Sequence, residues 1–319
     1  MGSTASLTDE YTAATTATAW LDRSERGKLA LTGGGAKEFL QGQVSNDIVG
    51  LAPGTGCYAA FLTPKGKMLG DLRVLDVGPP TDELLLDTER VALQELFNMI
   101  RHFSLGHDVQ LHKRTLERGL ISLLGPGAER VAGAGELPAT EHAHALLAVD
   151  SIEVRAVRTE GGIDLICDGD QTAELAAALT ARGAVGISET TAECVRIEHG
   201  RPRYGVDLDD TVIPQEAGLN ERAVSFQKGC YVGQETVARL FYRGKPNRQL
   251  RGLRLHEPVA AGSDVTAGDR VVGRITSVAN SPRFGEIGLA LVRREAPPGS
   301  AVTVGDEDVA ADVVELPFA

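Results

Sequence analysis

The sequence predicts an α+β protein of two or three domains whose last domain is all β. Its 319 residues exceed what one hydrophobic core ordinarily supports. Through Arg239, predicted strands alternate with helices and hairpins, which favours α+β modules over a doubly wound parallel sheet. After Arg239, short apolar runs recur about every ten residues between Gly and Pro, which is typical of a small barrel or sandwich.

The composition restricts the classes of partner. The chain is 42% hydrophobic and 24% charged, as in globular proteins, and its net charge of −12 argues against broad binding to nucleic acid or to anionic membranes. No apolar run approaches the ~20 residues that span a bilayer. The N-terminus lacks the basic start and apolar core of a secretory signal. We therefore expect a cytoplasmic monomer without direct nucleic-acid or membrane partners, and a mobile segment over residues 1–20.

In the first half, apolar periodicity predicts a helix over 36–43 with Phe39 and Leu40 on its buried face. The turn over 63–67 predicts a hairpin, and it places Asp71 within the second strand. Further helices are expected over 89–101 and 171–182. Strands are expected from Leu29 and over 56–62, 68–75, 84–86, 109–111, 119–124, 144–149, 152–157 and 164–167.

In the second half, a helix is expected from Glu189 to about His199, with Ser188 as its N-terminal cap. Glu198 falls in the last turn, where a carboxylate opposes the helix dipole. Such a local conflict can mark a functional residue. Another helix is expected over 234–240, followed by strands over 250–255, 270–275, 287–292, 301–304 and 309–314.

The four cysteines lie far apart without a CxxC pair, so no zinc site, disulfide framework or cluster-binding site is predicted. Cys230 lies in the glycine-containing stretch KGCYVGQE (228–235), with Lys228 two residues before it and a predicted helix start shortly after it. A cation and a helix N-terminus both favour the reactive thiolate. A buried, inert cysteine in a turn is the alternative.

Several stretches together resemble the YgfZ branch of the YgfZ/GcvT folate-binding proteins. They are FLQGQVSNDI (39–48), RIEHGRPRYGVDL (196–208), Pro214-x-Glu216, KGCYVGQE (228–235) and ARLFYRGKPNRQLRGL (238–253). The resemblance runs from about residue 20 to the end, and the KGCYxGQE loop separates YgfZ-like proteins from the glycine-cleavage aminomethyltransferases.

The resemblance implies a three-domain ring of the aminomethyltransferase folate-binding type with a C-terminal all-β barrel. After the mobile residues 1–20, it implies an N-terminal α+β domain over 21–115, which forms part of the folate-binding region. A second α+β domain over 116–245 carries RIEHG and KGCYVGQE, and the barrel covers 246–319.

The resemblance also implies a function. YgfZ-like proteins bind tetrahydrofolate or a one-carbon derivative and support the assembly or repair of iron–sulfur clusters. Their client enzymes include radical enzymes that modify tRNA.

By the same resemblance, Glu198 reads the polar edge of the pterin, because a carboxylate can accept two parallel N–H bonds. Tyr204 would lie nearby, and Arg196 is a further candidate for cofactor binding. No metal ligands are expected.

At the rim of the folate channel, Cys230 would act as a nucleophile, redox thiol or transient ligand, activated by Lys228. Gln234 and Glu235 would fix this loop, and both are counted among the candidate cofactor-binding residues.

One departure concerns catalysis. Aminomethyltransferases carry an acidic pair where this chain has Gly70 and Asp71, which puts ordinary glycine-cleavage activity in doubt. Two alternatives stay open beside the accessory function. One is a folate-dependent one-carbon transferase of the aminomethyl type, with Asp71 as catalytic acid or electrostatic stabiliser. The other is a non-catalytic scaffold whose acidic surface docks client enzymes.

Overall fold

A computed structural model describes residues 7–319 as two compact units, each built from separate stretches of the chain. The first unit comprises Met1–Phe61, Leu69–Ala192 and Arg222–Val232, and the second comprises Leu62–Met68, Glu193–Glu221 and Gly233–Ala319. The predicted domain boundaries stay a prediction, and each unit is described by itself.

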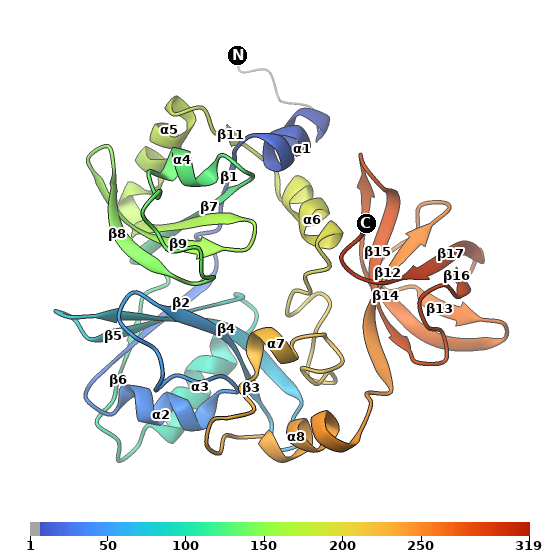
Figure 1. Cartoon of the computed structure of the whole chain (residues 1–319), viewed down its shortest axis with the longest axis horizontal. Coiled ribbons are helices and arrows are strands. Elements are labelled where there is room, and N and C mark those ends of the chain that lie inside the picture. The colour runs from blue at the N-terminus through green and yellow to red at the C-terminus, as the bar shows by residue number, and fades with distance from the viewer. Residues whose placement is uncertain (1–6) are drawn as a thin grey trace. The chain divides into compact units, whose positions relative to one another are not determined.

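A five-stranded antiparallel sheet in the first unit carries Asp71. Its order is β3 (Gly56–Leu62), β4 (Met68–Gly78), β5 (Glu83–Thr88), β2 (Gly27–Thr32) and β6 (Gln110–Lys113). Helices α2 (Ala36–Gln43) and α3 (Leu93–Phe103) lie on one face of this sheet (Figure 1). Phe39, Leu40, Leu96 and Ile100 are buried, as helical spacing requires of a core-facing stripe.

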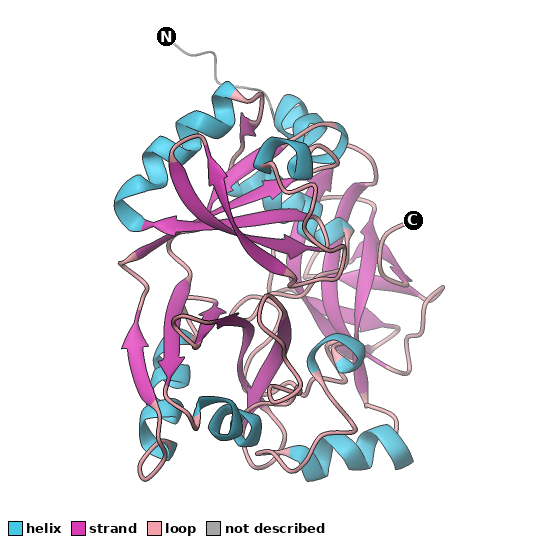
Figure 2. Cartoon of the chain, turned by 60° about the vertical axis from the view of Figure 1, so that its left-hand side comes forward, coloured by secondary structure: helices cyan, strands magenta, loops and turns pink. Residues whose placement is uncertain are grey.

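A six-stranded sheet forms the other layer of this unit. Its order is β11 (Val185–Gly186), β1 (Ala19–Asp22), β7 (Arg118–Leu124), β10 (Gly162–Asp168), β9 (Ile152–Thr159) and β8 (His144–Val149). Helices α4 (Ala128–Ala132) and α5 (Thr172–Ala181) share a core with one of its faces. Leu75 and Leu85 of the first sheet pack with Leu120, Val157 and Ile166 of the second, so the two sheets form stacked layers with helices outside them (Figure 2).

A closed six-stranded antiparallel barrel dominates the second unit. Its order is β12 (Arg248–Leu255), β15 (Gly285–Arg293), β14 (Arg270–Ser281), β13 (Asp264–Ala267), β16 (Ala301–Val304) and β17 (Val309–Val314). Alternate residues such as Leu253, Val265 and Val313 fill its interior. Helix α8 (Gln234–Arg243) belongs to the same unit, α6 (Glu189–Glu198) joins the two units in sequence, and α7 (Asn220–Ala223) is a single turn.

The predicted fold class, α+β with a C-terminal β barrel, is confirmed. The predicted strands and helices are present, although α3 begins at Leu93 rather than Glu89. The sequence analysis did not predict several short elements, namely α1, β1, α4, β11, α7 and β13. Among residues 7–319, no helix has the length and apolar character needed to cross a membrane.

The expectation of a mobile segment over residues 1–20 is wrong for residues 7–20. Helix α1 (Leu7–Thr16) buries Ala13 and Ala14, and β1 pairs along its whole length with β7 in the six-stranded sheet. Alanine and threonine, which gave no apolar period, are small enough to pack closely here. Residues 1–6 lie outside the described residues.

Candidate functional site

Asp71 is a buried carboxyl group on β4 in the first unit. The hydroxyl of Tyr58, from β3, donates a hydrogen bond of 2.6 Å to its Oδ2 atom. Burial raises the pKa of Asp71 from 3.8 to about 6, and the Tyr58 hydrogen bond opposes part of that rise. A carboxyl group with such a pKa exchanges its proton close to neutral pH, as a general acid or base must.

Charged side chains next to Asp71 form a separate, paired network. Arg26 bonds to Asp87 at 2.6 Å and also contacts Glu89, and Arg73 bridges Asp87 to Asp164. Burial raises the pKa of Asp87, but Arg26 and Arg73 outweigh burial and hold this pKa below its ordinary value. Asp87 is held as a carboxylate by its two arginine partners, whereas Asp71 is in no salt bridge among residues 7–319 and its raised pKa lets it take up a proton.

Packing excludes a second acid beside Asp71. A Cβ atom at Gly70 would lie 2.4 Å from the ring of Phe61 and 2.8 Å from Cβ of Ala92. Real Cβ atoms essentially never lie this close to another heavy atom, and both neighbours are themselves buried, so no larger residue fits at position 70 without repacking. Asp71 is therefore the one acid at this pair of positions, because the core packing at Gly70 has no room for a second.

Lys228 anchors the loop that carries Cys230. Its ammonium group donates to the backbone carbonyls of Gln41, Val44 and Asn46 at 2.5, 2.7 and 2.8 Å. Three acceptors use all three ammonium protons, and they all belong to the segment FLQGQVSNDI. Burial lowers the pKa of Lys228 to about 8, which leaves the group mostly charged at neutral pH. The structure thus joins two of the motifs recognised in the sequence.

Cys230 itself is exposed, whereas the next residue, Tyr231, is buried and stacks under the Lys228 ammonium at 5.1 Å. Cys230 is therefore not the buried cysteine of the alternative interpretation, and its reactivity stays a prediction. The thiol whose pKa responds to Lys228 is Cys57, where burial nonetheless raises the pKa to about 12. Activation of Cys230 by Lys228 stays a prediction.

Glu198, at the end of α6, is a buried carboxylate in the second unit. Its Oε1 atom accepts hydrogen bonds from Ser281 Oγ of the barrel at 2.5 Å and from Cys194 Sγ at 3.7 Å. Ser281 is itself held by the backbone amides of Arg283 and Phe284. The conflict with the helix dipole is thus resolved by donors from the barrel, a partner that no local pattern reveals.

Arg196 is engaged on every side within the second unit. Its guanidinium donates to Glu193, to the carbonyl of Arg201, to Asp207 and to Ser277. Asp207 is buried and also accepts from Ser277 Oγ at 2.7 Å. These hydrogen bonds connect α6 to the barrel strand β14, so Arg196 stabilises the packing of this helix against the barrel. Its direct contact with folate stays a prediction.

The remaining predicted residues also lie in the second unit. Tyr204 is half-buried and lies on a short bridge to Leu208. Gln234 and Glu235 form the first turn of α8, the former half-buried and the latter exposed. The cofactor roles of these three residues stay predictions.

Sequence reasoning missed Tyr58, Arg26, Asp207 and Ser281. None has a local signature: each gains its role from a partner more than ten residues away in sequence, such as Asp71 for Tyr58. The strand around Tyr58 was predicted from sequence, but a predicted strand does not show that Tyr58 pairs with Asp71.

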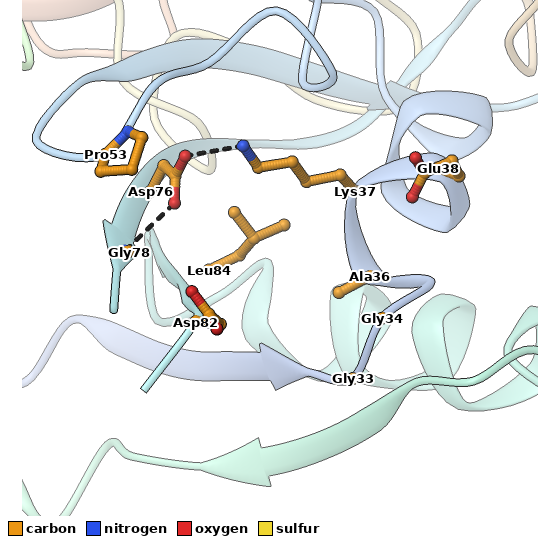
Figure 3. A pocket seen from close by; sticks show the side chains of 10 residues that line it. All are labelled: Gly33, Gly34, Ala36, Lys37, Glu38, Pro53, Asp76, Gly78, Asp82 and Leu84. Atoms are coloured by element: carbon orange, nitrogen blue, oxygen red, sulfur yellow. Dashed lines mark hydrogen bonds and ion pairs between the residues drawn. The ribbon is translucent and has the colours of Figure 1, made fainter. Parts of the chain in front are cut away.

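A pocket of about 510 Å³ opens in the first unit near the start of α2 (Figure 3). Lys37 reaches across it to Asp76 at 2.7 Å and also donates to the carbonyl of Leu51. The glycines Gly33 and Gly34 form another part of its wall. None of the predicted site residues lines this pocket.

Comparisons with known proteins agree with this fold. The GCVT N-terminal domain model matches residues 3–228, and the glycine cleavage T-protein C-terminal barrel domain model matches residues 248–319. An aminomethyltransferase of Geobacillus thermodenitrificans is 28% identical over 340 residues, covering 98% of this chain and 90% of that protein. A putative chloroplastic transferase of Arabidopsis thaliana is 28% identical over 311 residues, covering 93% and 70%.

Among solved structures, the glycine cleavage system aminomethyltransferase T from Bartonella henselae superposes with a TM-score of 0.86. It is 22% identical, and the match covers 98% of this chain and 89% of that one. At 22% sequence identity, this structural similarity establishes the fold and nothing further.

Proposed function

We propose, from the premise that this chain belongs to the glycine cleavage T-protein family, that it is a folate-dependent one-carbon transferase of the aminomethyl type. Relatives named aminomethyltransferase that cover nearly the whole chain support this reaction class. The single structural observation that carries it is Asp71, a buried carboxyl group whose pKa of about 6 suits proton or charge chemistry at neutral pH.

The second unit offers an acceptor that suits a folate. The pterin ring of a folate presents an edge of N–H donors, and the buried carboxylate of Glu198 can accept these hydrogen bonds. Ser281 holds this carboxylate in place. When bound, tetrahydrofolate supplies the amine nitrogen that takes up the one-carbon unit. Glu198 would hold the pterin, and Tyr204 is the next candidate contact.

Asp71 and Tyr58 would supply the charge chemistry. Tyr58 donates to Oδ2 of Asp71, which favours the carboxylate form and fixes its orientation. The carboxylate then stabilises developing positive charge on the transferred group or takes up a proton from it. The absence of an acid at position 70 leaves this work to Asp71 alone.

The test is the production of methylenetetrahydrofolate from an aminomethyl donor by wild type, Asp71→Asn and the exposed control Asp269→Asn. We expect turnover by wild type, a loss of about 100-fold or more in Asp71→Asn and no change in the control. No turnover by wild type, or equal turnover by Asp71→Asn, would exclude the transferase.

A second candidate function is the one that the YgfZ resemblance implies: a folate-binding accessory protein for iron–sulfur client enzymes. Two observations favour it, namely the exposed thiol of Cys230 on a loop held by Lys228 and the core packing that excludes a second acid at Gly70. Cys230 would act as the nucleophile, redox thiol or transient ligand, and Asp71 would have no catalytic role.

This candidate is tested in a strain that lacks the gene. Wild type should restore the activity of an iron–sulfur enzyme, while Cys230→Ala and Cys230→Ser should not, although both fold normally. Full restoration by either variant would remove the thiol from the account and leave the transferase.

A further inference from the structure

Arg222 lies over the ring of Tyr58, the residue that donates a hydrogen bond to Asp71. The central carbon of its guanidinium group is 5.2 Å from the centre of the ring, within the range of a cation–π contact. Its Nη2 atom also donates to Oε1 of Glu141 at 2.7 Å, so both a carboxylate and an aromatic ring hold the guanidinium. All four residues belong to the first unit.

The backbone of Arg222 is fixed next to the backbone of Tyr58. The side-chain amide of Asn46 donates to the carbonyl of Tyr58 at 2.8 Å and to the carbonyl of Arg222 at 3.1 Å. The neighbouring Ser45 Oγ donates to the carbonyl of Ala223 at 2.6 Å. The contact between the two side chains is therefore set by these hydrogen bonds as well as by their own attraction.

Arg222 has a charged partner at neutral pH. The Nε2 atom of His142 lies 3.7 Å from the same oxygen of Glu141. Burial lowers the pKa of His142 to about 4, so this ring is neutral at pH 7. At this pH, Arg222 rather than His142 is the charged partner of Glu141.

We propose that Arg222 is a positioning residue for Asp71: it holds the ring of Tyr58 so that the hydroxyl group donates to the Asp71 carboxyl group. A cation on the face of a phenol ring restricts the ring and makes its hydroxyl group a better donor. Accordingly, Arg222 opposes the rise in the pKa of Tyr58 that burial and Asp71 cause. The consequence for turnover rests on the proposed transferase, whereas the effect on the hydrogen bond does not.

The other charged groups around Asp71 stay in place when Arg222 is replaced. They are Arg26, directly before β2, Asp87 on β5, and Glu89, directly after β5. Their effects on the pKa of Asp71 are common to wild type and variants. A change in this pKa therefore reports on the Tyr58 hydrogen bond.

The test measures the pKa of Asp71 by carbon-13 NMR of the aspartate carboxyl groups in the full chain, with Asp71→Asn to assign the signal. The variants are Arg222→Gln, which removes the cation, and Glu141→Gln, which leaves the cation but removes its ion pair. The matched control is Arg114→Gln. The side chains of Arg114 and Arg222 are both 27% exposed, and each donates to a glutamate at 2.7 Å.

We expect Arg222→Gln to raise the pKa of Asp71 by about 0.5 or more, Glu141→Gln to raise it by less, and the control to leave it unchanged. In a Tyr58→Phe background, Arg222→Gln should add little, because its effect passes through Tyr58. Equal pKa values in wild type and both variants would overturn the proposal. So would an equal rise in the Tyr58→Phe background, which would show a direct effect of charge. If Arg222→Gln does not fold, the comparison of Glu141→Gln with wild type is decisive.

Turnover provides a second measurement. The kcat/KM profile of Arg222→Gln should move to higher pH, in the same direction as that of Tyr58→Phe. A profile at the wild-type position would exclude a role of Arg222 in the reaction. No turnover by wild type would refute the transferase and leave the NMR result on Arg222 valid.

Discussion

Among single residues, Asp71 has the most direct consequence for pH dependence. Burial raises its pKa from 3.8 to about 6 in the folded protein, whereas in the unfolded chain it titrates near 3.8. Between these values the folded state binds more protons than the unfolded state, so the free energy of unfolding falls as pH rises from about 4 to about 6. This group's share of stability is fully present below its unfolded pKa.

Asp71→Asn should remove that pH dependence. From pH 4 to pH 7, wild type should lose about 2 kcal/mol of unfolding free energy more than the variant. Urea denaturation of both proteins across this range measures the difference, in which the other carboxyl groups cancel. Parallel stability curves would show that Asp71 titrates as an ordinary exposed acid.

The same group predicts a pH profile for activity. If the carboxylate form is the active one, kcat/KM should rise through an apparent pKa of about 6 and level off above it. Tyr58→Phe removes the hydrogen bond that opposes the burial effect, so the profile should move to higher pH. A profile unchanged in Tyr58→Phe would contradict the assignment of that pKa to Asp71.

Gly70 offers a test of the packing argument at the neighbouring position. Gly70→Ala places a Cβ atom against Phe61 and Ala92 and should cost about 1–3 kcal/mol of unfolding free energy. Gly42→Ala is the matched control, because nothing lies within 4 Å of its Cβ position and alanine favours the helix. It should be neutral or slightly stabilising; destabilisation of equal size at both positions would mean that packing is not the cause.

At the scale of elements, the position of the loop around Cys230 depends on one cation, the ammonium group of Lys228. Lys228→Met leaves three carbonyls without their shared donor and should cost about 1–3 kcal/mol, measured by chemical denaturation. Hydrogen exchange should become faster in the loop 225–232 and in 41–46 but not in the barrel. The exposed Lys65→Met serves as the control, and equal exchange in the two variants would refute the anchoring role.

The elements also show how far sequence reasoning reaches. Helix α2 and the barrel strands β12 and β15 follow from apolar periodicity, because that signal is local. Helix α1 did not, since it is rich in alanine and threonine. Strand β1 has only four residues and is ordered by pairing with β7 and β11, which no local pattern reveals. Local signals thus predict elements that bury a clear stripe and miss those that another element orders.

The same distinction applies to the candidate site: the sequence points to some of its residues but not to their partners. Asp71, Glu198 and Lys228 were singled out from sequence because each stands in a motif or opposes a local rule. Their partners were beyond reach: Ser281 lies 83 positions from Glu198, and the carbonyls that hold Lys228 lie more than 180 positions away. The role of Lys228 as an anchor depends on those distant contacts.

For the whole molecule, the fold and the family agree, and the proposed reaction depends on folate. The family models together cover nearly the whole chain, and the buried carboxylate of Glu198 has the chemistry to accept the N–H edge of a pterin. Both proposed functions therefore require that the protein bind tetrahydrofolate. They differ only in which residue acts afterwards, Asp71 or Cys230.

An anaerobic calorimetric titration with tetrahydrofolate tests this common requirement most directly. It compares wild type with Glu198→Gln, which keeps the size of the side chain but replaces one acceptor oxygen with a donor, and with the exposed control Glu307→Gln. We predict saturable binding by wild type and Glu307→Gln and a loss of about tenfold or more in affinity for Glu198→Gln. An absence of binding by wild type, or equal affinity in all three proteins, would contradict the account.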